Sequence, residues 1–360
     1  MTQERMREDA LQLLREMICI PSPSFEEHQV CRLLGSRLRE WGIECEEYGC
    51  NLVARCPDFN PARRTLELDA HMDTVPPSAD YTRNSFDPMC DPDIIFGLGS
   101  NDDGGSVVAM AAAFRHFYGM SLPFNLVLAL TCEEERSGEG GAKWLYGENG
   151  PLRDADWVIV GEPTGMKAAV SERGLLVLDA VAHGISGHAA RGEGVNALYI
   201  ALEDIEALRS HRFGRISPTM GEVRLNVTQI QAGKAHNVIP DFCSFVVDIR
   251  PTDSYTCAEI LSELQPLCRS SLTARNLNNR SSATRVESPL LRTARRLGLE
   301  TFSSPTTSDW MRISCDAIKM GPGDSARSHH ADEYILCSEV SEAIGKYITF
   351  INSLYGDTLE

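Results

Sequence analysis

The sequence lacks the features of several protein classes. No apolar run approaches the ~20 residues of a membrane-spanning helix. The twelve cysteines are scattered and include no Cys-x-x-Cys pair, which disfavours a zinc knuckle. Positive charge is scarce, because 34 Lys and Arg stand against 51 Asp and Glu, for a net charge of −17. This balance argues against nucleic acid or an anionic membrane as a partner.

The beginning of the chain has no apolar signal region. Its first residues, Met1-Thr2-Gln3-Glu4-Arg5, lead into an amphipathic helical pattern. A chain of 360 residues can bury a large core and needs no disulfide bonds for stability. The thiols therefore indicate a reducing compartment, and we expect a cytoplasmic protein of roughly two domains.

Strand-like and helix-like segments alternate in both outer parts of the chain. Short apolar runs that predict strands lie at 65–70, 125–130, 157–160 and 317–320. Helical patterns lie at 104–117, 140–146 and 338–355. This alternation predicts an α/β fold, with a mostly parallel sheet and helices on both of its faces.

The pattern changes in the middle of the chain. Segments there follow the order β-α-β-β-α-β, at 174–182, 195–209, 223–230, 242–250, 255–267 and 272–277. This order is typical of a ferredoxin-like α+β sandwich. We therefore predict a catalytic domain formed by 1–172 and 281–360, with an inserted lid domain at 173–280.

A shorter motif lies near the start of the chain. Ser24-Phe25-Glu26-Glu27 matches a capping box. It predicts the start of a helix that runs to Trp41, and a purely structural role for these side chains.

Histidines and carboxylates follow the predicted strands. His71 follows the first run, the Glu133–Glu135 run follows the second, and Glu162 follows the third. His329 follows the fourth run after a Gly-Pro-Gly turn. Ligands of open α/β sheets gather at the carboxyl ends of the strands. Any one of these motifs alone would more often be structural, but their joint placement favours a functional site.

The residue types suit a site for two metal ions. Two ions about 3.5–4 Å apart need one carboxylate that bridges them. Asp102 is the natural bridge, because it lies on a Gly-rich turn just before a helix. His71 and Glu162 can complete one metal site, and Glu135 and His329 the other. Such ligands suit catalytic zinc.

Two further residues have a place beside these ligands. Asp73 lies two residues after His71 on an extended segment, where it can hold the imidazole by a hydrogen bond. Glu134 is next to a ligand without being one. It is therefore placed to act as the general base.

These motifs resemble those of the family of acetylornithine deacetylase and succinyl-diaminopimelate desuccinylase, which also includes aminoacylases, carboxypeptidase G2 and several dipeptidases. The resemblance runs from about Ile20 to Leu354. Its most specific motifs are Ala70-His71-Met72-Asp73-Thr74-Val75-Pro76, Gly97-Leu98-Gly99-x-x-Asp102, Cys132-Glu133-Glu134-Glu135, Val160-Gly161-Glu162-Pro163-Thr164 and Gly321-Pro322-Gly323 before His329.

The resemblance implies a catalytic domain with two Zn²⁺ ions, for which Co²⁺ or Mn²⁺ can substitute, and a lid that forms a homodimer. It assigns the same ligands, the same base and the same place for Asp73. It also implies a cis peptide bond between Asp102 and Asp103. His188, in Gly184-Ile185-Ser186-Gly187-His188-Ala189-Ala190, is implied to reach the partner chain's site and to stabilise an oxyanion there.

Three positions depart from the family pattern. Glu133 stands where Asp is usual, and Asp103-Gly104-Gly105 stands where Met-Lys-Gly often follows the bridging Asp. The last ligand motif contains the doublet His329-His330. Register against Asp332-Glu333 favours His329 as the ligand.

The resemblance also implies how a substrate is held. Arg250 matches the lid arginine that grips the α-carboxylate of an N-acyl-L-amino acid through a paired contact. Asn237, Arg173 and Thr307 match positions that line the pocket. The chain is most similar to the acetylornithine deacetylase branch. We therefore expect hydrolysis of an N-acetyl- or N-succinyl-ornithine or -citrulline to the free amino acid and the carboxylic acid, as in arginine biosynthesis.

Other functions remain open at this point. A succinyl-diaminopimelate desuccinylase, a dipeptidase or a carboxypeptidase would use the same two metals. A non-catalytic binding protein on this fold is the alternative from another class, but no ligand and no base is lost from the sequence.

Overall fold

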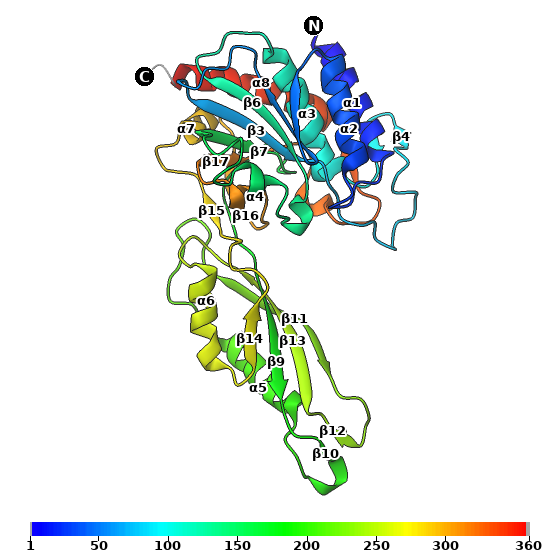
Figure 1. Cartoon of the computed structure of the whole chain (residues 1–360), viewed down its shortest axis with the longest axis vertical. Coiled ribbons are helices and arrows are strands. Elements are labelled where there is room, and N and C mark those ends of the chain that lie inside the picture. The colour runs from blue at the N-terminus through cyan, green and yellow to red at the C-terminus, as the bar shows by residue number, and fades with distance from the viewer. Residues whose placement is uncertain (1, 358–360) are drawn as a thin grey trace. The chain divides into compact units, whose positions relative to one another are not determined.

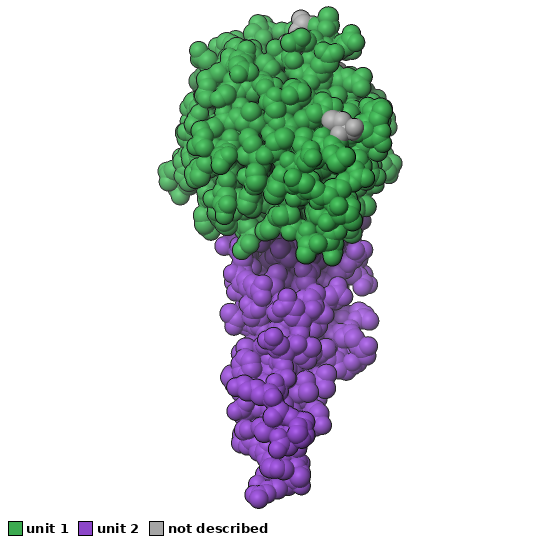
Figure 2. Space-filling model, turned by 90° about the vertical axis from the view of Figure 1, so that its right-hand side faces the viewer, with its two compact units in different colours: residues 1–170, 284–302, 308–360 green, residues 171–283, 303–307 purple. Residues whose placement is uncertain are grey.

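The computed structural model describes residues 2–357, which form two compact units (Figure 2). Unit 1 comprises 2–170, 284–302 and 308–357, and unit 2 comprises 171–283 and 303–307. The sequence predicts a lid at 173–280. It does not predict that the short segment 303–307 also belongs to unit 2. This segment is bonded within unit 2, because Thr307 Oγ1 donates a hydrogen bond to the carbonyl oxygen of Arg173 at 3.0 Å.

A large sheet forms the centre of unit 1 (Figure 1). Its four middle strands are parallel, in the order β6 (Asn125–Thr131), β3 (Thr65–His71), β7 (Trp157–Val160) and β17 (Asp316–Lys319). Antiparallel strands flank them, with β1 (Cys45–Tyr48) and β2 (Asn51–Arg55) beside β6, and β8 (Ala168–Glu172), β15 (Ser282–Ala283) and β16 (Thr301–Ser304) at the other edge. The predicted α/β class is confirmed.

The sheet is covered on both faces, which explains the continuous apolar runs of its strands. One face packs against long helices, namely α1 (Gln3–Ile18), α2 (His28–Glu40), α3 (Gly105–Phe117), α7 (Pro289–Arg296) and α8 (Cys337–Asp357). The other face packs against the short α4 (Ala142–Leu145) and the 3₁₀ turn η5 (Asp309–Arg312). Alternate residues of β6 belong to these two cores: Leu128 faces the long helices, and Ala129 faces α4.

A small antiparallel sheet lies beside the large one in unit 1. It has the strand order β18 (Tyr334–Leu336), β5 (Ile94–Phe96) and β4 (Cys90–Asp91). The π-helical turn η1 (Ser100–Gly104) then leads directly into α3. This turn carries the predicted bridging residue Asp102, and the Asp102–Asp103 peptide bond is cis.

Unit 2 has the predicted ferredoxin-like arrangement. Its antiparallel sheet has the strand order β11 (Arg224–Ala232), β13 (Phe242–Arg250), β9 (Leu176–His183) and β14 (Ser271–Ala274). The helices α5 (Ala197–Ser210) and α6 (Cys257–Leu264) pack on the sheet with the core residues of its strands. A separate two-stranded antiparallel sheet pairs β10 (Gly187–His188) with β12 (Val238–Ile239).

The predicted capping box before α2 is wrong. The helix begins at His28, its N-cap is Glu27, and no side chain caps it. Ser24 and Glu27 instead make hydrogen bonds to residues far away in the sequence. Within residues 2–357, no helix is long and apolar enough to cross a membrane.

Candidate metal centre

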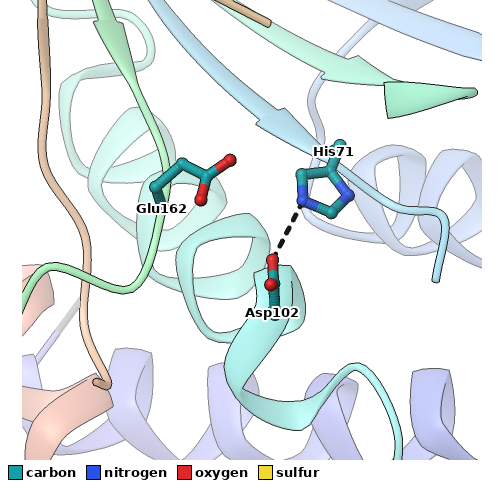
Figure 3. Close-up of side chains that lie close together, drawn as sticks. All are labelled: His71, Asp102 and Glu162. Atoms are coloured by element: carbon teal, nitrogen blue, oxygen red, sulfur yellow. Dashed lines mark hydrogen bonds and ion pairs between the residues drawn. The ribbon is translucent and has the colours of Figure 1, made fainter. Parts of the chain in front are cut away.

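The predicted ligands of unit 1 gather at the carboxyl ends of the parallel strands. His71 is the last residue of β3, Glu135 lies in the 3₁₀ turn η2 (Glu134–Arg136) after β6, and Glu162 follows β7. Asp102 reaches the same place from η1 (Figure 3). The fold therefore brings together side chains that lie far apart in the sequence, such as His71 and His329.

Two groups of ligand atoms share Asp102. His71, Asp102 and Glu162 offer atoms that all lie within 4.8 Å of one another, as do Asp102, Glu135 and His329. Asp102 Oδ1 is 3.2 Å from His71 Nε2, and its Oδ2 is 3.8 Å from His329 Nε2. One carboxylate thus presents one oxygen to each histidine, which is the arrangement that a bridge between two cations needs.

The ring orientation of His71 is set by its backbone partner. The Nδ1–H of His71 donates a hydrogen bond to the carbonyl oxygen of Asp73 at 3.0 Å, because a carbonyl can only accept. Nε2 therefore faces Asp102. Burial lowers the pKa of His71, but hydrogen bonds to Asp102 and Asp73 outweigh it, so the pKa is raised well above its ordinary value.

The carboxylate of Asp73 differs from its predicted use. Its Oδ1 lies 3.5 Å from His71 Nδ1, as an ion pair, while the Nδ1–H of the imidazole donates its hydrogen bond to the Asp73 carbonyl oxygen. The two carboxylate oxygens accept instead from the backbone N–H groups of Glu134, at 3.0 Å, and Glu135, at 3.2 Å. Asp73 therefore holds both the ligand His71 and the turn that carries the predicted base.

The centre accumulates negative charge with little compensation. Burial raises the pKa of Glu134 well above its ordinary value, and the neighbouring Glu162 and Glu135 raise it further. The pKa of Glu135 is also raised, first by burial, despite its hydrogen bond from His329 Nε2 at 3.0 Å. Divalent cations would relieve this repulsion. The donor set of two imidazoles and crowded carboxylates therefore fits two metal ions.

Glu333 is a further residue of this centre. In the sequence it serves only to distinguish His329 from His330 as the ligand. Its buried Oε1 accepts from the backbone N–H groups of Asn101, at 2.8 Å, and Asp102, at 3.0 Å. Burial and the nearby Asp102 raise the pKa of Glu333 to about 8. The only sequence signal was its place four residues after His329, which does not distinguish a support of the Asp102 turn from a surface carboxylate.

The three departures from the family pattern have structural explanations. The Glu133 carboxylate accepts from Gly140 N–H at 2.8 Å and so closes its own loop. A side chain at Gly104 would collide with the carbonyl oxygen of Gly99 and lie 2.8 Å from Leu14 Cδ1, so this turn has no room for a lysine. His329 belongs to a ligand group, whereas the exposed His330 belongs to none within residues 2–357.

The predicted residues of unit 2 have partners of their own. Ala190 N–H donates to His188 Nδ1 at 3.2 Å, so the neutral ring carries its proton on Nε2. Arg250 forms a paired contact with Asp248, through Nε at 2.8 Å and Nη2 at 3.0 Å. Asn237 is exposed, and its carbonyl oxygen accepts from Ala189 N–H at 3.0 Å.

Arg173 is occupied by the backbone of unit 2. Its Nη1 donates to the carbonyl oxygens of Glu222, at 2.7 Å, and Arg250, at 3.4 Å, and its Nη2 donates to that of Met220. Thr307 donates to the Arg173 carbonyl oxygen. Both predicted pocket residues therefore have a structural use within unit 2.

Fold and site together define a metal-dependent hydrolase. The model of peptidase family M20/M25/M40 matches residues 68–353, and the chain belongs to this family. One similar protein is a proposed LysW-lysine/LysW-ornithine hydrolase of Pyrobaculum aerophilum, which is 28% identical over 93% of this chain and 94% of that protein. A succinyl-diaminopimelate desuccinylase of Xanthomonas campestris is 27% identical over 97% of this chain and 100% of that protein. An acetylornithine deacetylase of Myxococcus xanthus is 28% identical over 79% of each chain. The family expected from the sequence is confirmed.

Solved structures show the same fold. A tripeptidase from Staphylococcus aureus superposes with a TM-score of 0.78 at 20% identity, covering 97% of this chain and 99% of that one. A dinuclear metal binding peptidase of the M20 family from Bacillus subtilis gives a TM-score of 0.74 at 16% identity, covering 99% of each chain. At these identities the likeness is one of fold.

If Asp102 bridges two ions, Asp102→Ala should lose both of them. Glu162→Ala and His329→Ala should each retain about one ion per chain, because each removes a ligand from one group only. Metal analysis of the purified variants by mass spectrometry measures this. His330→Ala is the matched control and should keep both ions. Two tightly held ions in Asp102→Ala would contradict the bridging role.

Proposed function

We propose that the protein is a di-zinc deacylase that hydrolyses the amide bond of an N-acyl-L-amino acid, of the N-acetyl- or N-succinyl-ornithine or -citrulline type. The observation that carries the proposal is the shared carboxylate of Asp102 between two histidine–carboxylate groups, with Glu134 beside them. The amino acids in the names of the similar proteins are lysine, ornithine and diaminopimelate. They support an acylated diamino acid or a close derivative as the substrate class.

His71 and Glu162 would hold one Zn²⁺, Glu135 and His329 the other, and Asp102 both. Bound there, the two ions would polarise the amide carbonyl and make a water molecule acidic enough to lose a proton near neutral pH. The protein's own contribution is to fix these ligands. His71 is fixed by the Asp73 carbonyl, and the bridging turn is fixed by Glu333.

Glu134 is the proposed general base. It forms a ligand-distance group with His71 and Glu135, so it lies close to the reacting atoms without belonging to either group that contains Asp102. Its backbone is held by Asp73. The raised pKa of the buried Glu134 carboxylate suits a group that takes a proton from the attacking water and returns it to the departing amine.

Arg250 is the proposed ligand of the substrate α-carboxylate. Asp248 holds its guanidinium through Nε and Nη2, which leaves Nη1 outside that pair. The side chain is still one-third exposed. A guanidinium held in place from one side loses little further freedom when it binds a carboxylate.

We also propose that unit 2 forms a homodimer. Strand β11 lies at the edge of the unit 2 sheet, and large apolar side chains are exposed on β11 and on α5, namely Ile230, Tyr199 and Leu202. An unpaired edge strand beside exposed apolar groups suits a two-fold interface with a second copy. His188 would then serve the partner's site, where its Nε2–H can donate to the developing oxyanion.

A substrate screen tests the proposed function. Zinc-loaded protein should give its highest kcat/KM with N-acetyl- or N-succinyl-ornithine or -citrulline, compared with the corresponding lysine and diaminopimelate derivatives and with dipeptides. Arg250→Lys should lower kcat/KM by roughly 10- to 100-fold, the value of a charged hydrogen bond. It should match the parent protein on the same substrate with an amidated α-carboxyl group. A clear preference for dipeptides would instead support the peptidase alternative.

Glu134→Gln should lower kcat by at least ~10²-fold, because the amide cannot take a proton. The zinc content and KM should stay close to those of the parent protein. Steady-state kinetics and metal analysis measure both. Glu133→Gln is the matched control, since it keeps an oxygen that accepts from Gly140 and should remain active. If Glu133→Gln is inactive and Glu134→Gln is not, the base is Glu133.

Complementation tests the role of His188 across the dimer. Glu134→Gln and His188→Ala should each be nearly inactive alone. When the two are unfolded together and reassembled, half of the dimers are hybrids with one intact composite site, so about a quarter of full activity should return. If His188 serves its own chain, no site in the mixture is intact and no activity returns.

A further inference from the structure

The segment just before α2 makes polar contacts that a helix cap does not explain. The Ser24 hydroxyl donates a hydrogen bond to Asp73 Oδ2 at 2.6 Å. The buried Glu27 Oε1 accepts from the backbone N–H of Glu133 at 3.0 Å and from that of Phe25 at 2.9 Å. Both side chains thus reach the metal centre's supports, although neither belongs to a ligand group within residues 2–357.

The turn that carries Glu134 depends on side chains for its backbone hydrogen bonds. The N–H of Glu133 donates to Glu27, and the N–H groups of Glu134 and Glu135 donate to the two oxygens of Asp73. Just before them, Cys132 N–H donates to Asn51 Oδ1 at 3.0 Å. Four consecutive amides are therefore held by side chains and not by a sheet or a helix.

This turn also needs an unusual backbone conformation. Glu133 has φ of +63°, a left-handed conformation that residues other than glycine adopt at a cost. Glu27 accepts from the N–H of that same residue. The direction in which Glu134 leaves the backbone is set immediately after Glu133, so the contact with Glu27 helps to orient the Glu134 side chain.

The segment that carries these two residues is itself fixed beside the His71 strand. Thr74 N–H donates to the Ser22 carbonyl oxygen at 2.9 Å, and Ser24 N–H donates to that of Thr74 at 3.3 Å. Pro23 and Thr74 form a parallel bridge. Ser24 and Glu27 therefore act from a rigid position and not from a loose loop.

We propose that Glu27 and Ser24 are positioning residues for catalysis. Glu27 holds the left-handed residue before the base, and Ser24 holds the Asp73 carboxylate that binds the next two amides. Neither side chain belongs to a candidate ligand group within residues 2–357, so each acts through the residue that it holds. The inference rests on the proposed role of Glu134 as the base.

Glu27→Met tests the inference, because it keeps the length of the side chain and removes the acceptor. A displacement of about 1 Å at a reacting group costs up to ~10²-fold in rate, so kcat should fall by roughly 10- to 100-fold with KM and zinc content unchanged. Glu27→Gln keeps an acceptor oxygen and should restore kcat to within ~3-fold of the parent protein. Ser24→Ala, which leaves Glu27 in place, should lower kcat more mildly with the same unchanged KM.

Two controls separate positioning from general loss of stability. Val30→Ala removes buried volume from the same helix and leaves the Glu27 contacts in place, so it should lower Tm and keep kcat per folded, zinc-loaded chain. Glu26 is exposed, so Glu26→Gln should change neither Tm nor kcat. If Glu27→Met does not fold, Ser24→Ala decides the question by its kcat alone.

The outcomes distinguish this inference from the proposed function. Glu27→Met with the parent's kcat, or Ser24→Ala with the parent's kcat, overturns the positioning role while Glu134→Gln remains inactive. A loss of zinc from Glu27→Met in parallel with its loss of kcat also overturns it, because the effect would then act through the ligands. If Glu134→Gln is active, Glu134 is not the base. The proposed role of Glu134 then fails, and with it the reason for positioning this turn.

Discussion

The metal centre depends on hydrogen bonds from backbone amides to buried carboxylates. The turns that carry its ligands lie beyond the ends of the strands, so the sheet does not bond their N–H groups. Asp73 accepts from the turn of Glu134, and Glu333 accepts from the turn of Asp102. Each of these two carboxyl groups accepts from two consecutive amides. The positions of Glu134, the proposed base, and of Asp102, the proposed bridge, follow from these contacts.

The carboxyl groups around the candidate centre include two sets with different partners. Asp73, Glu27 and Glu333 accept hydrogen bonds from backbone amides. Asp102, Glu135 and Glu162 point at one another and at two histidines. Burial raises the pKa of Glu135, and a cation would favour its charged form. Metal binding at this centre would therefore be coupled to the stability of this edge of the sheet.

The two arginines predicted to contact substrate show how a guanidinium can serve either the fold or a ligand. Arg173 gives its donors to three backbone carbonyls. Burial, and then the like charge of Arg224, lower its pKa. Arg250 gives only one side of its fork, to Asp248, and stays partly exposed. In the sequence, both arginines match positions that contact substrate in the family. Only their hydrogen-bond partners in the structure distinguish Arg173, which supports unit 2, from Arg250, which can still bind a carboxylate.

The sequence predicts which side chains come together at this edge of the sheet, but it does not predict the side chains that support them, for a physical reason. Strands such as β3 and β6 are buried on both faces, so their apolar runs are plain, and their carboxyl ends place His71 and Glu135 with no further information. A side chain that supports a ligand can be recognised only from the residue to which it bonds in the structure. Ser24 bonds to a residue 49 positions away and Glu27 to one 106 positions away, yet Ser-x-x-Glu before a helix is also the local pattern of a capping box. The same short motif is compatible with both arrangements. In the structure, Ser24 and Glu27 bond to Asp73 and Glu133, and α2 begins without a side-chain cap.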